Sequence, residues 1–307
     1  MRRTLAGIGK VLITLGLLIL LFVAYQLWGT GIYTARAQNQ LESQFQESLV
    51  DAGVDDPLVA TPPTGTGGTS VPPTATNVPP APSVPDGDAM AHLVIPKIGL
   101  DSYVVQGVDE ADLRKGPGHY GVTSLPGQRG NAAIAGHRTT YGAPFGELDA
   151  LEAGDTIQIT TLQGAFEYRI YDKVVVAPDA YQVLEPDPDR ISILTLTTCH
   201  PKYSAAQRLI VRAELVLPPG ARPLPSSVNL DDPTVKREAL GNALSGDSGS
   251  RTPTVLVGLL TALIGGLWWL LFHRHPRWTT WIIGAIPFGI ALFAFYYLLE
   301  RVLPANY

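Results

Sequence analysis

The chain has 307 residues, of which 46% are hydrophobic and 16% are charged, and its formal net charge is −5 at pH 7. This acidic balance argues against nucleic acid as a partner, because surfaces that bind nucleic acid are basic. The length would allow two soluble domains, but the hydrophobic residues are concentrated in segments long enough to cross a membrane.

Three segments of the sequence are apolar enough to be membrane helices. Residues 11–35, 252–272 and 278–299 contain no charged side chain. Each is longer than the roughly 20 residues that a spanning helix needs. Tryptophans near the ends of these segments fit the interface between lipid and water, which amphipathic rings favour. We therefore expect three transmembrane helices.

The basic residues predict how these helices are oriented. Arg2, Arg3 and Lys10 precede the first segment, and Arg274 and Arg277 lie in the short loop between the last two. Because lysine and arginine accumulate in cytoplasmic loops, we expect the N-terminus inside the cell and both the long middle region and the C-terminal tail outside it. A cleaved signal peptide is the alternative for the first segment, but no A-x-A-like site follows it directly, which favours a retained anchor.

Polar regions connect the membrane segments to the middle of the chain. Residues 36–55 are polar and predict a stalk, with a helix as one possible form. Residues 57–86 are rich in proline, threonine and glycine, a composition that cannot bury enough apolar surface to fold. Their prolines favour extended polyproline II, so this region is interpreted as a spacer. Residues 219–250 form a second linker that returns the chain to the membrane.

The middle of the chain predicts one compact all-β domain over residues 89–218. Its apolar residues occur in short runs separated by turns with glycine and proline, and only residues 110–114 and 145–151 fit short helices. Such a pattern favours a β-barrel or a β-sandwich. The expected strands are HLVIP, SYVVQ, NAAIAGH, TIQIT, FEYRIYDKVVV, ISILTLTT and RLIVRAELVL.

Cys199 is the single cysteine of the chain, and it ends the strand-like run ISILTLTT. An unpaired cysteine in a domain expected outside the cell is a candidate reactive thiol. A cysteine nucleophile also needs a proton carrier and a donor where the oxyanion forms. The alternative is that Cys199 is a small buried apolar residue with no chemical role.

His137 and Arg208 are the candidate partners of this thiol. Histidine suits proton transfer because its ordinary pKa is about 6.5, and arginine stays charged and presents several donors. If the strand before Cys199 and the strand after it are antiparallel, Arg208 begins the return strand close to the thiol, whereas Arg212 lies further along it. His137 follows the strand NAAIAG, so all three candidates lie at strand ends.

Two other assignments are weaker. His119, in the segment GPGHYG, is a rival base for the same thiol. A metal site is disfavoured, because the sequence has no C-x-x-C or H-E-x-x-H spacing and no dense cluster of Asp and Glu with the spacing of oxygen ligands. The prediction is therefore a site that works without a metal or another cofactor.

These segments resemble the sortases, a family of membrane-anchored cysteine transpeptidases. The resemblance rests on AGHRTTYGAPFGELDAL, LTLTTCHPKYSAAQRLIVRAEL and GPGHY, and it is strongest for class E members of the family. It implies a sortase-type eight-stranded β-barrel with short helices. It also implies Cys199 as nucleophile, His137 as general acid and base, and Arg208 as the residue that stabilises the substrate carbonyl or oxyanion. Thr198 matches the family threonine that helps to shape the site.

The resemblance also implies a reaction and its partners. Sortases cleave a sorting signal such as LPXTG after its threonine through a thioester, and class E members are associated with LAXTG-like signals. An amine of the cell wall, or of another surface protein such as a pilin-like lysine, then takes the acyl group. The expected partners are exported proteins with a C-terminal sorting signal and such an amine acceptor. The loop residues Tyr141, Pro144, Phe145 and Tyr203 either line the peptide groove or pack the fold.

Two features of the sequence depart from this family pattern. Class E sortases typically rely on an N-terminal anchor, whereas two further apolar segments follow the domain here. Pilin-building class C enzymes carry an Asp-Pro-aromatic lid over the cysteine. The segment Asp56-Pro57-Leu58 lacks the aromatic residue and is interpreted as a chance match.

Two alternatives to a sortase remain open. A catalytically idle β-barrel could bind exported peptides as a scaffold in a membrane complex. An L,D-transpeptidase or peptidoglycan hydrolase also uses a lone cysteine, but the sequence lacks its S-x-G-C-type segment.

The expected organisation is a cytoplasmic N-terminus over 1–10, a membrane anchor over 11–35, a stalk and spacer over 36–88, the catalytic domain over 89–218 and a linker over 219–251. A membrane helix over 252–272, a cytoplasmic loop over 273–277, a membrane helix over 278–299 and an extracellular tail over 300–307 follow. The expected location is a bacterial cell membrane, with the domain on the outer side.

Overall fold

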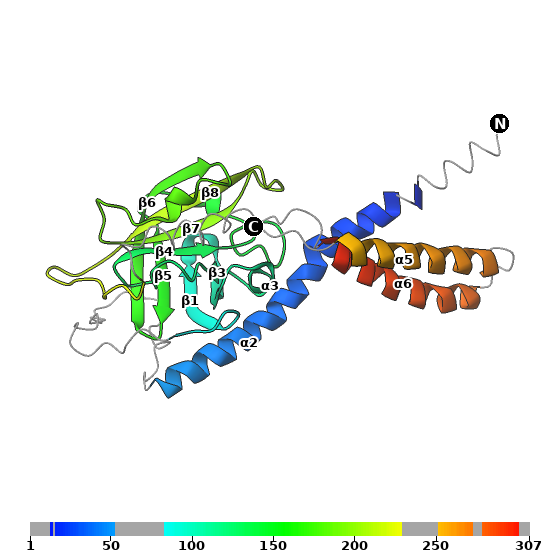
Figure 1. The fold of residues 1–307 in the computed structure, drawn as a ribbon, viewed down its shortest axis with the longest axis horizontal. Helices are drawn as coiled ribbons and strands as arrows, with labels where there is room; N and C mark the ends of the chain where they lie inside the picture. Colours follow the sequence, from blue (N-terminus) through cyan, green and yellow to red (C-terminus); the bar gives the residue numbers. More distant parts are fainter. Residues whose placement is uncertain (1–12, 15, 53–82, 229–250, 273–277, 301–307) are drawn as a thin grey trace. The chain divides into compact units, whose positions relative to one another are not determined.

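The computed structural model describes residues 13–14, 16–52, 83–228, 251–272 and 278–300. These residues fall into two compact units. The barrel unit contains the described residues from Gln26 to 228, and the helical unit contains those up to Tyr25 and those from 251 onward. Figure 1 shows both units. Most of the expected spacer, including Asp56-Pro57-Leu58, and most of the second linker lie outside the described residues.

Within residues 83–228, eight strands close into a barrel in the order β1-β2-β3-β4-β7-β8-β6-β5 (Figure 1). All seven strands expected from the sequence are present, and the fold is the predicted eight-stranded barrel. β3 had no counterpart among the expected strands, because it consists of only two residues in a glycine-rich segment. The strands are β1 (Ala89–Ile95), β2 (Leu100–Gln106), β3 (Gly118–His119), β4 (Gly130–Ala135), β5 (Thr156–Thr161), β6 (Gly164–Val176), β7 (Ser192–His200) and β8 (Gln207–Leu215).

Short helical turns connect these strands. The helix expected over 110–114 is observed as α3 (Glu110–Leu113), whereas the one expected over 145–151 shrinks to the single turn η4 (Leu148–Ala150). Two further turns, η3 (Pro96–Ile98) and η5 (Tyr181–Leu184), follow β1 and precede β7. Each of these helices has only three or four residues, so they serve as turns between the strands.

Alternate residues of each strand face the barrel interior, because successive side chains of a strand point to opposite faces. The core cluster includes Ala132 and Ile134 of β4, Leu194 and Leu196 of β7, and Leu209, Val211 and Ala213 of β8. Residues of the opposite parity on these three strands point to the outer face. Cys199 and Arg208 belong to this outward set, as the alternation in the sequence predicted for Arg208.

The barrel mixes parallel and antiparallel pairs. β4 and β7 are parallel, with Gly130 opposite Ser192 and Ala135 opposite Thr197, whereas β7 and β8 form an antiparallel hairpin. A parallel pair needs a crossover, and here residues 136–191, which include β5 and β6, supply it. As a result, β4 and β7 end at the same edge of the barrel, and β8 begins there.

A long helix, α2 (Thr30–Asp51), packs along the outside of the barrel beside β1 and β2 (Figure 1). Its residues Leu41, Phe45 and Leu49 are almost fully buried, and they form a cluster with Ala89, Tyr103 and Val105 of the barrel. Spacing of four residues places such side chains on one face of a helix. The ring centroids of Phe45 and Tyr103 lie 5.8 Å apart.

The side chain of Gln38 fixes this helix to the barrel with four hydrogen bonds. Its Nε2 donates to the carbonyl oxygens of Tyr103 and Lys115 at 3.0 and 2.9 Å. Its Oε1 accepts from Ser102 Oγ at 2.9 Å and from the backbone N–H of Tyr103 at 2.7 Å. The two donor and two acceptor positions that a side-chain amide offers are thus all engaged.

This packing differs from the expected organisation in two ways. Residues 36–51 are not a free polar stalk, because their apolar stripe is buried against the barrel. Thr30 and Thr34, which the sequence placed at the end of the first membrane segment, are also buried and form hydrogen bonds to Tyr141 and Arg114 of the barrel unit. The helix therefore begins to contact the barrel before the predicted segment ends.

The helical unit contains α5 (Arg251–Phe272) and α6 (Trp278–Glu300). The two helices are joined by hydrogen bonds from Thr254 Oγ1 to the Leu298 carbonyl oxygen at 3.0 Å and from Thr261 Oγ1 to the Ala291 carbonyl oxygen at 3.1 Å. Residues 16–24 are helical as well. The hydroxyl of Tyr296 on α6 donates to the carbonyl oxygen of Leu18 at 2.6 Å, so the N-terminal helix and α6 are in contact.

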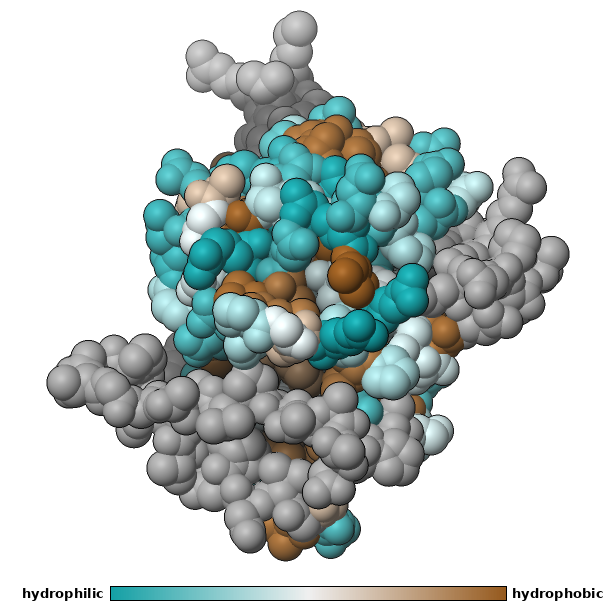
Figure 2. All heavy atoms as spheres, turned by 90° about the vertical axis from the view of Figure 1, so that its left-hand side faces the viewer, coloured by the Kyte–Doolittle hydropathy of each residue, from teal (hydrophilic) through white to brown (hydrophobic). Residues whose placement is uncertain are grey.

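One helix among the described residues is long and apolar enough to span a membrane, over Thr252–Leu271, and α6 contains a shorter apolar stretch, Ile283–Leu299. Large apolar side chains of both helices are exposed, among them Leu256, Leu259, Ile286 and Ile290. The barrel unit contrasts with this: on the face shown in Figure 2, hydrophilic side chains predominate and the apolar patches are small and separate. The first expected span lies partly outside the described residues.

Candidate active site

The β7–β8 hairpin brings Cys199 and Arg208 together. Cys199 lies at the end of β7, and its partner across the antiparallel ladder is Arg208 on β8. Neighbouring strands are about 4.8 Å apart, so the arginine is adjacent to the thiol, as the sequence predicted. Arg212 pairs with Thr195 instead, and its Nε donates to Asp172 Oδ2 at 3.0 Å.

The parallel pair β4–β7 adds His137 to this site. The β4–β7 ladder ends with Ala135 opposite Thr197, so two more residues along each chain bring His137 level with Cys199. The backbone N–H of Gly136 donates to the Thr197 carbonyl oxygen at 3.1 Å, and Thr198 Oγ1 donates to the Gly136 carbonyl oxygen at 2.7 Å. These bonds continue the contact between the strands up to His137.

The three predicted residues therefore lie side by side at one edge of the barrel. His137 follows the end of β4, Cys199 lies near the end of β7, and Arg208 lies near the start of β8. All three are buried: the exposed fraction is 4% for His137, 2% for Cys199 and 3% for Arg208. The guanidinium of Arg208 is held by the carbonyl oxygens of Ala205 and Gln207, both 3.1 Å from Nη1. This fixes the positive charge beside the thiol before any substrate binds.

Burial and charge act on the thiol in opposite directions. Burial raises the pKa of Cys199, and the charges of Arg208 and Arg138 lower it, with burial as the larger influence. The thiol is therefore mostly protonated at neutral pH, and it needs a base to become a nucleophile. A neighbouring histidine can supply that function.

The loop after His137 is held by contacts of its own. The backbone N–H of Phe145 donates to the His137 carbonyl oxygen at 3.0 Å, and Thr140 Oγ1 lies 3.4 Å from His137 Nδ1. The ring of Tyr141 packs against the imidazole, with 4.9 Å between the ring centroids. Arg114 places its guanidinium carbon 5.5 Å from the centroid of the same tyrosine ring.

The five residues that the sequence associated with substrate lie in different environments. Phe145 is fully buried in the barrel core, so it packs the fold and does not line a surface groove. A Cβ at Gly136 would lie 2.6 Å from the Phe145 ring, which explains why a glycine precedes His137. Thr198 is also fully buried, Tyr141 is nearly so, Pro144 is half-buried, and Tyr203 is exposed in the β7–β8 loop.

The rival base His119 is part of the barrel structure. It is 1% exposed on β3. Its Nε2 donates to the Ser124 carbonyl oxygen at 2.9 Å, and its Nδ1 lies 3.0 Å from the Gln106 side-chain amide. Burial lowers the pKa of His119 to about 4. A histidine with these hydrogen bonds and this pKa is neutral at pH 7, and its ring is held in one orientation. This favours His137 as the proton carrier.

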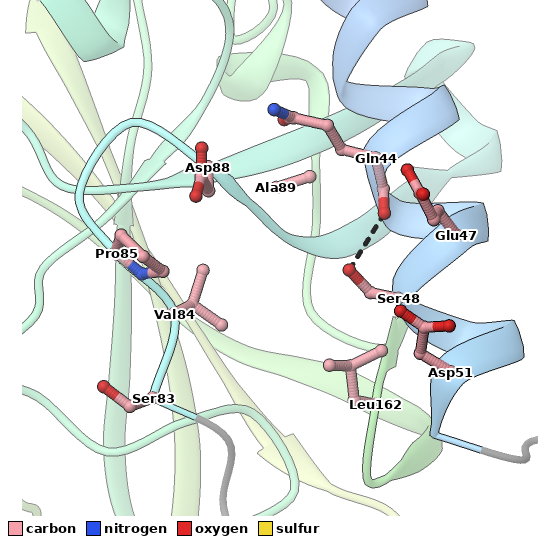
Figure 3. Close-up of a pocket in the computed structure, with 10 residues that line it drawn as sticks. All are labelled: Gln44, Glu47, Ser48, Asp51, Ser83, Val84, Pro85, Asp88, Ala89 and Leu162. Carbon is pink, nitrogen blue, oxygen red and sulfur yellow. Dashed lines mark hydrogen bonds between the residues drawn. The ribbon is translucent and has the colours of Figure 1, made fainter.

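A separate hollow of about 270 Å³ lies between the C-terminal part of α2 and the start of β1 (Figure 3). Glu47 and Asp51 of α2 and Asp88 line it, and Ser48 donates to the Gln44 carbonyl oxygen at its wall. None of the three candidate residues belongs to it. Among the described residues, no group of three or more His, Cys, Asp or Glu side chains is arranged to hold a metal ion.

Two contributors to the site were not identified from the sequence. Arg138 contacts the backbone of Cys199, and Thr30 of α2 contacts the loop of His137. The first could have been suspected, because Arg138 adjoins His137 in the segment AGHR. The second had no signal in the sequence, because Thr30 lies far from the barrel along the chain and within an apolar segment.

Comparison with known proteins agrees with this geometry. Residues 93–216, which include His137, Cys199 and Arg208, match the family model of the sortase domain. The chain is 31% identical over 224 residues to sortase SrtE1 of Streptomyces coelicolor, across 68% of this chain and 56% of that protein. It is 35% identical over 115 residues to sortase D of Bacillus subtilis, across 38% of this chain and 56% of that protein.

A solved structure of sortase E from Streptomyces avermitilis is 37% identical and covers 44% of this chain and 91% of that chain, with a TM-score of 0.40. The matches span only a little more than half the length of the two curated relatives. The similarity to class E expected from the sequence is confirmed by SrtE1. The eight-stranded barrel of this chain is a sortase domain, and its sequence is similar to that of class E members of the family.

Proposed function

We propose that this chain is a cysteine transpeptidase that cleaves a sorting signal of the LPXTG or LAXTG kind after its threonine and transfers the acyl group to an amine. The observation that carries the proposal is the alignment of His137, Cys199 and Arg208 at one level of three neighbouring strands. Each residue type fits one requirement of acyl transfer through a thioester: a base, a nucleophile and a donor to the oxyanion.

In the first half-reaction, the Cys199 sulfur attacks the carbonyl carbon of the Thr–Gly bond. His137 accepts the thiol proton as the C–S bond forms and the carbonyl carbon becomes tetrahedral, and it then passes this proton to the departing glycine amine as the C–N bond breaks. Arg208 donates to the oxygen that becomes negative in the tetrahedral intermediate. Proton transfer of this kind contributes about 10²–10⁴-fold, and one oxyanion donor about 10²–10³-fold.

In the second half-reaction, an acceptor amine attacks the thioester carbonyl. His137 now takes a proton from the amine and returns it to the Cys199 sulfur as the C–S bond breaks. The product is a new amide, and the thiol is restored. The burial of all three side chains supports transfer to an amine, because a site closed to bulk solvent limits hydrolysis of the thioester.

The same proposal assigns partners and a location. The donor would be an exported protein with a C-terminal sorting signal, and the acceptor an amine of a peptidoglycan precursor or a pilin-like lysine. The apolar helix over Thr252–Leu271 supports attachment to a bacterial cell membrane. The basic residues around the apolar segments favour a catalytic domain on the outer side.

The experiment uses the full-length protein in detergent with LAXTG and LPXTG peptides and with triglycine as the acceptor. Mass spectrometry should detect cleavage between threonine and glycine, transfer to triglycine, and no reaction with Cys199→Ala. Arg208→Ala should lower kcat/KM by about 10²–10³-fold. Arg212→Ala, on the same strand and paired with Asp172, is the matched control and should change it little.

Two results would overturn the proposal. Cleavage of the peptide with transfer to triglycine by Cys199→Ala, which has no thiol left, would remove the cysteine from its assigned role. Failure to cleave either peptide, together with a Cys199 thiol that does not react with alkylating reagents, would leave the idle scaffold as the better assignment.

A further inference from the structure

Arg138 is a buried arginine that connects the two loops of the candidate active site. It directly follows His137, and 2% of its surface is exposed. Its Nη1 donates to the carbonyl oxygen of Cys199 at 3.0 Å and lies 3.1 Å from Nδ1 of His200, which acts as the acceptor. Its Nη2 forms an ion pair with Asp149 Oδ1 at 2.8 Å. One guanidinium thus binds three acceptors from two segments, the end of β7 and the turn η4.

The position of these bonds matters because the β4–β7 ladder ends just before the site. The register closes with Ala135 opposite Thr197, two residues before His137 and Cys199. Beyond that point, the Thr198 hydroxyl bonded to Gly136 and the Arg138 guanidinium bonded to Cys199 join the two strands. The Arg138 bond reaches the backbone of the cysteine itself.

We propose that Arg138 is a positioning residue of the acyl transfer, which holds the Cys199 backbone level with His137 and places a second positive charge beside the thiolate. The proposal rests on the thioester reaction assigned above. Asp149 holds the outer half of the guanidinium and thereby orients the half that faces Cys199. Arginine suits this task because its planar fork can bind several acceptors at once, whereas lysine offers a point charge.

Two roles follow for the same side chain, and they can be separated by substitution. The charge favours the thiolate, because Arg138 lowers the pKa of Cys199 against the effect of burial. The fork fixes geometry, and an error of about 1 Å in the placement of reacting groups can cost about 10²-fold in rate. Arg138→Met removes both the positive charge and the planar group that binds several acceptors. Arg138→Lys keeps the charge but loses this planar group.

The test measures thiol reactivity and turnover separately in the full-length protein. Alkylation of Cys199 by iodoacetamide as a function of pH reports the thiolate without any substrate, and kcat and KM for a cleavable peptide report the reaction. Arg138→Met should move the alkylation profile to higher pH and lower kcat by on the order of 10²-fold, with little change in KM. Arg138→Lys should keep the alkylation profile close to native and still lower kcat by at least severalfold.

Matched variants distinguish this role from a general effect on folding. Arg169→Met removes an exposed arginine of β6 and should leave both readouts unchanged. Asp149→Asn keeps the Arg138 charge and loosens the fork, so it should resemble Arg138→Lys. If Arg138→Met does not fold, Arg138→Lys and Asp149→Asn still decide the question.

The outcomes separate this inference from the proposed function. An unchanged alkylation profile and unchanged kcat in Arg138→Met would overturn the inference and leave the transpeptidase intact. A native kcat in Arg138→Lys and Asp149→Asn would remove the positioning role. If the native protein cleaves no peptide, the proposed function fails, and the alkylation profile of Arg138→Met still decides whether the charge acts on Cys199.

Discussion

The hydroxyl of Thr30, in the first turn of α2, accepts a hydrogen bond of 3.0 Å from the backbone N–H of Tyr141. Tyr141 has a φ of 52°, a conformation that few residues other than glycine adopt, and its ring packs against His137. Tyr33 on the same helix contacts the Tyr141 ring, with 6.4 Å between centroids. The helix that precedes the barrel in the sequence therefore supports the loop that carries the proposed acid and base.

Substitution of Thr30 tests this support. In Thr30→Val the buried Tyr141 N–H loses its acceptor, and an unsatisfied buried donor costs about 1–3 kcal/mol. We expect hydrogen exchange of the Tyr141 amide to accelerate by on the order of 10-fold and kcat for the sorting-signal peptide to fall severalfold. Thr30→Ser keeps the hydroxyl and is the control. Equal exchange rates in the two variants would show that the contact does not hold the loop.

The apolar stripe of α2 makes a second prediction, this time about stability. Phe45 is fully buried against Tyr103, whereas Val50, five residues later on the same helix, is 77% exposed. Phe45→Ala should destabilise the packing of α2 on the barrel by about 3–5 kcal/mol, because truncation of a buried aromatic side chain leaves a cavity. Val50→Ala should change little.

Pulse proteolysis of the full-length protein in urea can measure this effect, because cleavage within residues 26–52 reports the release of α2. Equal protection of the two variants would contradict the packing. The same contact bears on deletions: removal of residues 36–88 would expose Tyr103 and Val105, and the first turn of α2, which supports the His137 loop, would lose the packing that holds the helix on the barrel. Such a deletion should lower activity, whereas a lid over the site would predict a rise.

The strands of the barrel were predictable because each carries its own signal. β7 and β8 alternate between core and outer residues, and this alternation also showed that Arg208 points away from the core. β3 was not predicted, because two residues in a glycine-rich segment are too few to show an alternation of apolar and polar side chains. The pairing of Cys199 with Arg208 followed from a short hairpin, which fixes the register between consecutive strands.

The parts that the sequence did not reveal depend on contacts between distant segments. The apolar stripe of α2 is one residue wide, at Leu41, Phe45 and Leu49, and its burial depends on a partner surface on β1 and β2. In the sequence it is therefore outweighed by the polar residues around it. Arg138 meets Cys199 only because β4 and β7 are parallel neighbours, although 61 residues separate them in the chain.

The burial of Cys199 predicts an unusual dependence of thiol reactivity on pH. Burial raises the pKa of Cys199 above its usual value, and Arg208 is the larger of the two charges that oppose this. The thiolate therefore appears only at higher pH than in an ordinary thiol. The rate of alkylation of the folded protein should keep rising with pH where the same protein unfolded in urea has already reached its plateau.

Substitution of Arg208 tests the direction in which its charge shifts the pKa of Cys199. Loss of its charge removes an influence that lowers the pKa, so in Arg208→Met the rise in alkylation should move further toward alkaline pH. The shift should exceed that of Arg138→Met, because the Arg208 charge acts more strongly on the thiol. Arg212→Met, whose guanidinium pairs with Asp172, should leave the profile in place. A folded thiol that titrates at or below the pH of the unfolded one would contradict the burial of Cys199.

His119 makes the barrel sensitive to acid. Its pKa is lowered from 6.5 to about 4, because burial disfavours the charged imidazolium. The unfolded chain therefore binds a proton between these two values that the folded barrel does not bind. This contribution to stability is complete above pH 6.5, and it is lost as the pH falls through that window toward 4.

The free energy of unfolding of the barrel should therefore fall by on the order of 3 kcal/mol between pH 7 and pH 4 on account of this residue alone. In His119→Gln the barrel should be less stable at pH 7, since the bond to Ser124 is disturbed, but this part of the acid dependence should disappear. His92→Gln, on β1 and in contact with Asp101, is the control and should retain it. Pulse proteolysis in urea at several pH values measures both. An acid dependence as steep in His119→Gln as in the native protein would mean that another group titrates in this range and that His119 is not the buried neutral base of β3.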